Sequence, residues 1–422
     1  MKFPFEDESF AFETLRSAGF ANYGGADLGE VLVTARAIPA GDEGAWHAVW
    51  KRAAERAERI GEEAASRGHA VSAREAWLRA TNYYRTAELY LRDDPARDAE
   101  AEHLSARSRE AFASAAGLMD RPVWPVAIPY ERTTLPGYFF SVDDSGEPRP
   151  TIVFNGGFDS TLEEAYFAIG AAALRRGYNV LAFDGPGQGA ALREQGLHFR
   201  HDWEEVVRPV IDVALTIPEV APDRIALVGY SLGSYLAARA AAFEHRIAAL
   251  ILHGGVFDYH QVSLRAVPPW LADWIMAGRD DVALPVTELL MSQSTSLRWA
   301  LRNGRWAFGA TSVLDYARRT RQYTLEGVID RIEAPTLVLD AENDQFFRGE
   351  ARRVATELSC PHDLVTLPEA EDAGEHAHAG SLARFHQMAF DWLDETMRPL
   401  RAKQGDFELR ERDRDGLLVL NP

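Results

Sequence analysis

Residues 225–239 read Ile-Ala-Leu-Val-Gly-Tyr-Ser-Leu-Gly-Ser-Tyr-Leu-Ala-Ala-Arg, and this stretch decides the fold. Its apolar start is typical of a buried strand, and its alanine-rich end favours a helix. Between them stands the G-x-S-x-G motif of residues 229–233. The motif alone also occurs by chance, but a strand before it and a helix after it place the serine on a strained turn, with its hydroxyl exposed above a sheet. The stretch therefore predicts that Ser231 is a nucleophile.

The composition is that of a soluble globular protein, with 46% hydrophobic and 26% charged residues. Acidic residues number 64 and basic ones 45, and the net charge of −19 repels nucleic acid and anionic membranes. No apolar run reaches the roughly 20 residues that span a bilayer, and residues 1–8 lack the features of a signal peptide. The single cysteine, Cys360, excludes an internal disulfide framework. We expect a cytoplasmic protein with neither a nucleic-acid nor a membrane partner.

The first part of the chain, residues 1–120, is predicted to be a helical domain. Helix starts are indicated by capping residues, and a capping box pairs Ser or Thr with Glu three residues later. No second copy of the pattern recurs at a fixed period, so a helical-repeat array is rejected. The expected helices run from the Asp42 cap to Gly68, from the Ser72–Glu75 capping box to Leu91, and from Asp94-Pro95 to Ala116.

From residue 121 onward, strand-like and helical stretches alternate, which predicts an α/β fold with a doubly wound sheet. The later strands are continuous apolar runs, typical of parallel strands that are buried on both faces. The expected strands are Pro125–Tyr130, Leu135–Val142, Thr151–Asn155, Asn179–Phe183, Arg224–Val228, Ala248–His253, Thr336–Asp340 and Asp363–Leu367. The expected helices are Leu162–Arg176, Asp202–Leu215, Ser231–Phe243, Gly349–Leu358 and Ser381–Met397.

Residues 261–330 interrupt this alternation with helical pieces and proline breaks, and we interpret them as a helical cap over the active site. Four of the ten tryptophans fall there: Trp270, Trp274, Trp299 and Trp306. The core then comprises residues 121–260 and 331–400 on either side of the cap. Residues 401–422 are a charge-rich tail with Leu-Leu-Val-Leu at 417–420, predicted to pack on the body or on a partner chain.

A serine hydroxyl needs a base within hydrogen-bond reach and an acid that orients the base. After a nucleophile of the G-x-S-x-G type, the acid and then the histidine follow along the chain. Asp344 is the predicted acid, because it lies in the loop after the strand that follows the cap. The alternatives are Asp340, Glu342 and Asp258.

The predicted base is His376, in an acidic, glycine-containing loop after the last expected strand. His378, two residues on, is the alternative base and otherwise a residue of the pocket wall. His386 falls within the following helix and is expected to be structural.

Two backbone N–H groups are expected to hold the oxyanion that forms on the substrate. One belongs to Leu232, the residue after the nucleophile. The second comes from the loop after the strand 151–155, from either Gly157 or Phe158. The substrate pocket is predicted to include Asp159, Tyr230, Trp270, Trp274 and His378, with the tryptophans facing an apolar or aromatic substrate.

The glycine-rich segment 184–189 lacks the G-x-G-x-x-G spacing and a P-loop lysine, so it is interpreted as a tight structural loop. No cluster has metal-ligand spacing, and His-Ala-His at 376–378 is too isolated to count. We expect no metal and no cofactor.

With these residues identified, the chain resembles the α/β-hydrolase superfamily over about residues 125–400. It is similar to the branch with an N-terminal helical domain that includes 2,6-dihydroxypseudooxynicotine hydrolase and the fungal polyketide-shortening hydrolases. The resemblance implies a Ser231, Asp344, His376 triad between core and cap, possible cleavage of a carbon–carbon bond beside a ketone, and a homodimer. The segments that carry it are Asn155–Thr161, Phe183–Gly189, Arg193–Gly196 and Ala240–Arg246.

These observations predict a cofactor-free serine hydrolase that cleaves a carbon–carbon bond next to a ketone, or an ester, in an apolar or aromatic small molecule. An acyltransferase or cyclase could use the same three residues if water were excluded. A binding protein that kept the fold is a further alternative, since fold alone does not establish function. Residues 1–120 could also form a separate module that recruits a partner.

Overall fold

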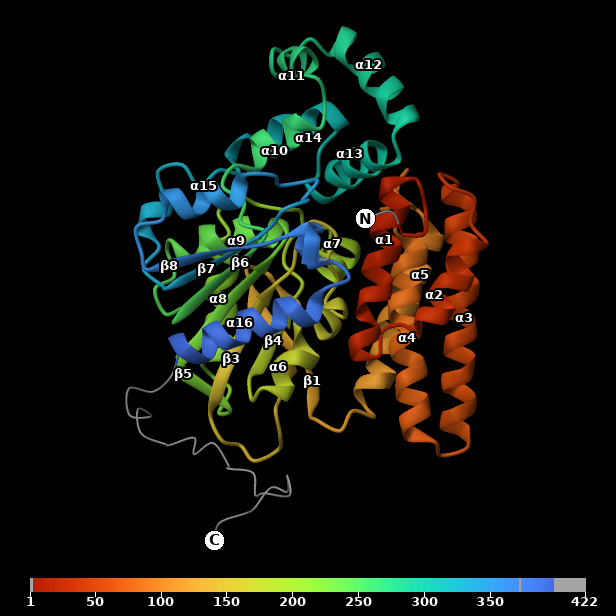
Figure 1. The fold of residues 1–422 in the computed structure, drawn as a ribbon, viewed down its shortest axis with the longest axis vertical. Helices are drawn as coiled ribbons and strands as arrows, with labels where there is room; N and C mark the ends of the chain where they lie inside the picture. Colours follow the sequence, from red (N-terminus) through yellow and green to blue (C-terminus); the bar gives the residue numbers. More distant parts are fainter. Residues whose placement is uncertain (1–2, 372, 398–422) are drawn as a thin grey trace, which may run out of the picture.

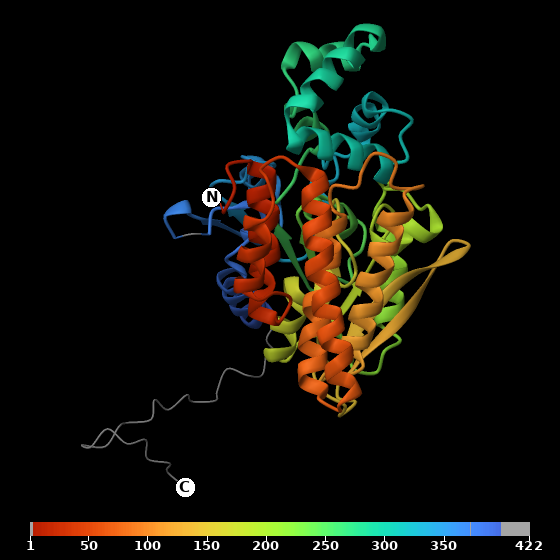
Figure 2. The same cartoon turned by 90° about the vertical axis from the view of Figure 1, so that its right-hand side faces the viewer.

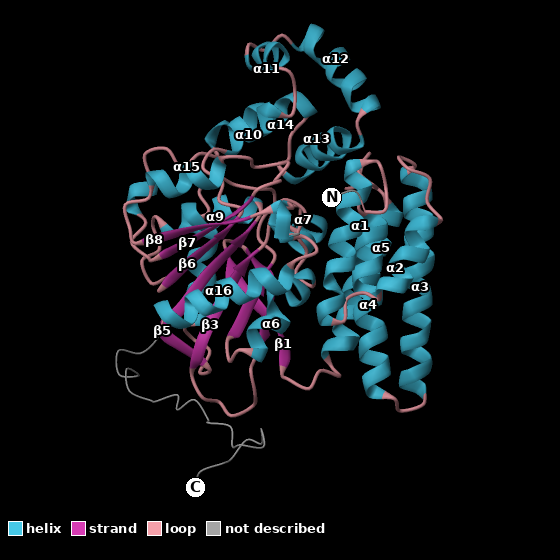
Figure 3. Ribbon diagram, in the orientation of Figure 1, coloured by secondary structure: helices cyan, strands magenta, loops and turns pink. Residues whose placement is uncertain are grey.

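Figure 3 shows a central sheet flanked by helices in the computed structural model, which describes residues 3–371 and 373–397. The predicted tail at 401–422 lies outside the described residues. The described strands form one eight-stranded sheet in the order β1-β2-β4-β3-β5-β6-β7-β8. The pairings of β1 with β2 and of β2 with β4 are antiparallel, and all pairings from β4 to β8 are parallel.

Each strand expected from the sequence is present, with ends shifted by a few residues. The alternation of strands and helices therefore builds the mostly parallel sheet that the apolar runs predicted. The strands are β1 Val123–Tyr130, β2 Thr133–Phe140, β3 Arg149–Asn155, β4 Asn179–Phe183, β5 Val220–Tyr230, β6 Ala249–His253, β7 Thr336–Ala341 and β8 His362–Leu367.

Both faces of the sheet are covered by helices, as β5 illustrates. Successive side chains of a strand point to opposite faces. Leu227 packs in the cluster that contains α8 and α9, whereas Ala226 and Val228 pack in the cluster that contains α6 and α16. The helices are α6 Ala171–Arg175, α7 Gly189–Gln195, α8 Glu204–Ala214, α9 Leu232–Ala241, α15 Glu350–Glu357 and α16 Leu382–Thr396.

The N-terminal helices stand along one side of the core (Figure 1, Figure 2). They have an apolar core of their own that includes Trp46, Trp50 and Tyr83, all fully buried. Phe20 and Phe112 belong instead to the cluster on one face of the sheet, so the N-terminal region packs directly on the α/β core. They are α1 Glu8–Gly19, α2 Leu28–Arg36, α3 Glu43–Ser66, α4 Ala70–Glu88 and α5 Ala99–Ala116.

Two of the three predicted helix starts in this region are wrong. Asp42 caps α3 as expected, since its carboxylate accepts the Ala45 N–H. However, α4 begins at Ala70, so Ser72 lies inside the helix and forms no cap. The Asp98 carboxylate accepts the N–H groups of residues 100 and 101, and α5 therefore starts after it rather than at Asp94-Pro95.

The segment between β6 and β7 is helical and lies above the sheet in Figure 1. None of the described helices is both long and apolar enough to cross a membrane. The inserted helices are α10 Tyr259–Arg265, α11 Pro269–Met276, α12 Asp280–Gln293, α13 Thr295–Ala307 and α14 Val313–Arg319. Short helical turns lie at Phe20–Tyr23, Tyr166–Gly170, Thr320–Gln322, Ile329–Arg331, Glu369–Glu371 and His376–His378.

Candidate active site

Ser231 stands on a sharp turn between β5 and α9, with φ 59° and ψ −127°. A non-glycine residue at positive φ is strained and persists only where its surroundings hold it. Both glycines of the motif are required by close packing. A Cβ on Gly229 would lie 2.2 Å from the carbonyl oxygen of Gly233, and one on Gly233 would lie 2.4 Å from that of Asn155. The local structure is thus the strand, turn and helix that the motif predicted.

The structure brings Ser231, His376 and Asp344 together in a hydrogen-bonded line. Ser231 Oγ is 2.8 Å from His376 Nε2, and His376 Nδ1 is 2.7 Å from Asp344 Oδ2. The other carboxylate oxygen of Asp344 accepts the N–H groups of Phe346 and Phe347, each at 2.8 Å. Burial opposes ionisation of Asp344, but His376 and these two N–H groups outweigh it, so its pKa lies below the usual value. The geometry is that of a nucleophile, a base and an orienting acid.

The other acids considered from the sequence are engaged elsewhere. Asp340 accepts a hydrogen bond from Thr366 at 3.1 Å, and Glu342 accepts the N–H of Glu369 at 2.8 Å. Asp258 caps α10. Within the described part of the chain, none of the three is hydrogen-bonded to His376.

His378 is buried beside His253, and the two rings stack. Burial lowers the pKa of His378 to about 4, so the ring is neutral near pH 7. It does not line the cavity, contrary to the prediction. Tyr230 does line the cavity, and its hydroxyl donates to the carbonyl of Ala377 at 3.0 Å. Because Ala377 has a positive φ of 51°, Tyr230 helps to hold the strained turn that carries His376.

The oxyanion loop, residues 155–160, passes directly against the serine turn. A Cβ on Gly157 would lie 3.0 Å from the Cβ of Ser231, so glycine permits this approach. The Gly157 N–H donates to Ser160 Oγ at 2.6 Å. The Phe158 N–H has no protein acceptor among the described residues. The structure therefore favours Phe158 over Gly157 as the second oxyanion donor, beside Leu232 at the first position of α9.

The glycine-rich segment 184–189 is a structural loop with a role that the sequence did not indicate. Its Gln188 donates from Nε2 to the carbonyl oxygens of Gly156 and Gly157, at 2.6 and 3.0 Å. Its side-chain oxygen accepts the N–H of Gly185 at 2.9 Å. Gln188 thus ties this loop to the oxyanion loop, a contact between segments that are about 30 residues apart in sequence.

A cavity of about 230 Å³ opens beside Ser231. Its wall combines residues from three parts of the chain, namely the core, the inserted helices and α1. The contribution of α1 to the cavity wall was not predicted, because no local sequence pattern shows which helix packs on a distant loop. The side chains from α1 are Phe12, Glu13 and Arg16, and aromatic ones from the core loops and inserted helices are Phe158, Tyr259, Trp299, Tyr316, Phe346 and Phe347.

The prediction that Trp270 and Trp274 line the pocket is not met, since neither belongs to the wall. They pack on each other on α11, with ring centroids 5.0 Å apart, and Trp270 is 47% exposed. In Figure 1, α11 lies farther from the sheet than α10 and α14 do. Trp299 of α13 lines the cavity instead. All these tryptophans look alike in sequence, and only the packing of the helices separates them.

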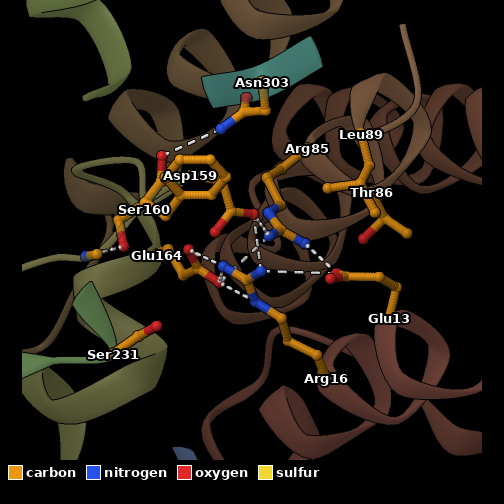
Figure 4. Close-up of polar contacts among 12 residues, drawn as sticks. Glu13, Arg16, Arg85, Thr86, Leu89, Asp159, Ser160, Glu164, Ser231 and Asn303 are labelled. Carbon is orange, nitrogen blue, oxygen red and sulfur yellow. Dashed lines mark hydrogen bonds and ion pairs between the residues drawn. The ribbon is translucent and has the colours of Figure 1, made fainter. Parts of the chain in front are cut away.

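Asp159 lines the cavity as predicted, and it belongs to a buried ionic cluster (Figure 4). It accepts hydrogen bonds from Arg16 at 2.9 Å and from Arg85 at 2.8 Å. Burial opposes its ionisation, but the two arginines outweigh burial and hold its pKa at about 2. Burial raises the pKa of Glu13, which is 3.3 Å from Arg85.

In residues 3–371 and 373–397, no group of three or more His, Cys, Asp or Glu is placed to hold a metal ion.

The sequence profile of the alpha/beta hydrolase family matches residues 151–389, which include the serine turn, the inserted helices and the His376 loop. This chain belongs to the alpha/beta hydrolase family. The match agrees with the observed sheet, in which the turn that carries Ser231 follows a central parallel strand.

Two similar hydrolases match nearly the whole chain, including the N-terminal helices. A hydrolase of a Fusarium species is 36% identical over 411 residues, covering 93% of this chain and 97% of the relative. The 20-hydroxy-prefusarin hydrolase of Gibberella moniliformis is 35% identical over 411 residues, with the same coverage.

A solved structure, that of 2,6-dihydroxy-pseudo-oxynicotine hydrolase, is similar with a TM-score of 0.72 and 22% identity, covering 90% of this chain and 95% of that one. At this identity the likeness concerns the fold. The helical region, the core and the inserted helices thus form an arrangement that other hydrolases share.

Proposed function

We propose that this hydrolase uses Ser231 as its nucleophile, with His376 as the base and Asp344 as the acid that orients it. The observation that carries the proposal is the hydrogen-bonded line of these side chains, at 2.8 and 2.7 Å, beside the cavity. A hydroxyl becomes a useful nucleophile only when a base accepts its proton as it attacks. A binding protein would have no need of all three groups in this order.

The reaction then proceeds in two steps. Ser231 Oγ attacks the carbonyl carbon while its proton moves to His376 Nε2, and the oxyanion lies against the N–H groups of Leu232 and Phe158. The bond from the carbonyl carbon to the leaving group breaks, and the leaving group takes the proton from His376. Water, deprotonated by His376, attacks the acyl-serine and releases a carboxylic acid, and the proton returns to Ser231.

We propose a neutral substrate with an aromatic or conjugated apolar body. The aromatic side chains of the wall, Tyr259, Trp299 and Tyr316 among them, support the apolar body. The ionic side of the wall presents Glu13, Asp159 and Arg16. These pair with Glu164 and Arg85 outside the wall, so carboxylates outnumber arginines in the cluster and an anionic group is disfavoured. The relative named 20-hydroxy-prefusarin hydrolase supports a hydroxylated small molecule as the substrate.

We propose that the bond broken lies next to a ketone or in an ester, since His376 can protonate a carbanion or an alkoxide alike. Product analysis with a panel of aryl β-diketones and matched aryl esters tests this. We expect carboxylic acid formation from at least one set, and its loss in Ser231→Ala with unchanged circular dichroism. Equal turnover by Ser231→Ala would contradict the proposal. Products in which an added alcohol or an internal nucleophile takes the acyl group would indicate transfer or cyclisation instead.

A further inference from the structure

Arg16 of α1 and Arg85 of α4 reach from the N-terminal helices to the residue that follows the oxyanion donor (Figure 4). Resting on the proposed function, we propose that these two arginines are positioning residues for the Phe158 N–H and that they act through Asp159. The helical region is then part of the catalytic apparatus of this hydrolase, although it contributes none of the three side chains in line.

The ionic cluster fixes Asp159 with little freedom. Its Oδ2 is shared by Arg16 and Arg85, at 2.9 and 2.8 Å. Arg16 also binds Glu164 through Nε and Nη2, both at 2.8 Å, and Glu164 lies just after the oxyanion loop. The side chains of Arg85 and Asp159 are only 6% and 12% exposed. Charge-assisted hydrogen bonds in a desolvated site are strong and directional.

The peptide groups on both sides of Phe158 are held as well. Its carbonyl accepts a hydrogen bond from Asn303 of α13 at 3.3 Å, and Asn303 accepts one from Arg92 at 3.0 Å. The Gly157 carbonyl shares a planar peptide group with the Phe158 N–H and accepts from Gln188 at 3.0 Å. Holding that carbonyl aims the N–H in the opposite direction. The donor is therefore set by its neighbours, while it has no protein acceptor itself among the described residues.

The charges of the cluster identify the variant to make. Glu13, Asp159 and Glu164 face two arginines, so loss of an arginine would leave buried carboxylates without compensation. Asp159→Asn leaves two carboxylates and two guanidinium groups and keeps the side-chain volume. It weakens the hold on the loop while each remaining carboxylate keeps a guanidinium partner, and the variant should fold.

The test compares Asp159→Asn with Arg109→Gln in hydrolysis of p-nitrophenyl acetate by the full chain. Arg109 of α5 pairs with Glu194 of α7 and also joins the helical region to the core, and among the described residues it forms no hydrogen bond with residues 155–160. Removing an oxyanion donor lowers kcat by roughly 100- to 1000-fold, and we expect Asp159→Asn to lower kcat by about 30-fold because the donor is displaced rather than lost. KM should change by less than about threefold, as for an interaction made in the transition state. Arg109→Gln should match the wild type.

A second comparison separates positioning from general stability. Arg16→Lys keeps the positive charge but loses the forked contacts of the guanidinium group. If Arg16 acts through Asp159, then Arg16→Lys lowers kcat in the wild type but has little further effect in Asp159→Asn. Additive losses, a wild-type kcat for Asp159→Asn, or an equal loss in Arg109→Gln would each overturn the positioning role alone, provided that Ser231→Ala is inactive. A Ser231→Ala variant as active as the wild type would overturn the proposed nucleophile and the positioning role together.

Discussion

The N-terminal helices and the inserted helices hold the same residue, Phe158, in different ways. The N-terminal helices reach its backbone through the ionic bonds of Asp159. The inserted helices surround its ring with Tyr259, Trp299 and Tyr316, at centroid distances of 5.8 to 6.4 Å. They touch its backbone through a neutral group, the amide of Asn303, at 3.3 Å. Ionic bonds with fixed geometry suit the placement of a reacting group, whereas aromatic contacts can adapt to the apolar part of a bound substrate. We therefore expect changes on the first side to alter kcat and changes on the second to alter KM.

The largest expected effect is that of removing the N-terminal helices. Phe20 stacks on Phe167 at 5.3 Å, and Phe112 lies 6.3 Å from Phe140, so a chain that starts at Arg121 exposes a broad apolar face. We expect this truncated chain to aggregate and to lack activity, as measured by size-exclusion chromatography and ester hydrolysis. If it remained monodisperse and active, the helices would be a separate module that is not needed to hold the backbone at Phe158.

Asp344→Asn tests whether the Asp344 carboxylate orients His376 for the reaction of Ser231. The amide cannot stabilise a protonated His376 as a carboxylate does, and we expect kcat to fall by about 10,000-fold with little change in the melting temperature. Asp340→Asn is the matched control, because Asp340 lies on the same strand end but bonds to Thr366. A similar loss of kcat in both variants would mean that Asp344 has no special role.

The contact of the core with the N-terminal helices and its contact with the inserted helices should also differ in how they change the unfolding free energy with pH. His386 of α16 is fully buried against Tyr23 of the N-terminal region, at 2.7 Å, and burial lowers its pKa to about 4 from an ordinary 6.5. As the pH falls, His386 binds a proton in the unfolded chain at a higher pH than in the folded chain. Its contribution to the unfolding free energy is therefore fully present above about pH 6.5 and is lost as the pH falls toward 4, by about 2 kcal/mol at pH 5. We expect His386→Gln to remove this part of the pH dependence of urea unfolding.

His260, the half-buried histidine of the inserted region, is the control for that experiment. His260→Gln should alter the slope of unfolding free energy against pH much less than His386→Gln does. Equal slopes in the two variants would contradict the assignment of the pH response to the N-terminal junction.

The smallest expected effect is on substrate binding. Trp299→Ala should raise KM for an aromatic ester by about 10-fold with a smaller change in kcat, since one aromatic contact is lost from the cavity wall. Trp270→Ala, on the outer α11, should leave both constants unchanged. Steady-state kinetics on p-nitrophenyl and naphthyl esters would measure this, and an effect of Trp270→Ala equal to that of Trp299→Ala would place the substrate elsewhere.

The sequence predicted what local patterns determine. Apolar runs located the strands, and the G-x-S-x-G motif with its order of partners located Ser231, Asp344 and His376, whose side chains meet in the structure. The start of α5 was missed because the Asp98 carboxylate caps it, and the start of α4 was missed because that helix begins at Ala70 without a side-chain cap. The choice between Gly157 and Phe158 needed the hydrogen bond to Ser160, which no spacing reveals.

Contacts between distant segments could not be predicted in the same way. Arg16 and Asp159 are 143 residues apart in sequence, and each would be an ordinary surface residue without the other. Trp299 lines the cavity where Trp270 was predicted to, and this too depends on how the inserted helices pack. Burial of charge is decided by tertiary structure, and a single sequence carries no signal for it.

We propose that His376 activates the hydroxyl of Ser231. Reaction with a fluorophosphonate, followed by mass spectrometry of the peptides, tests it most directly, because such probes phosphonylate an activated serine. We expect a single adduct on Ser231 in the wild type and a labelling rate lower by at least about 1000-fold in His376→Ala. An absence of adduct on Ser231, or equal labelling of the two proteins, would contradict it.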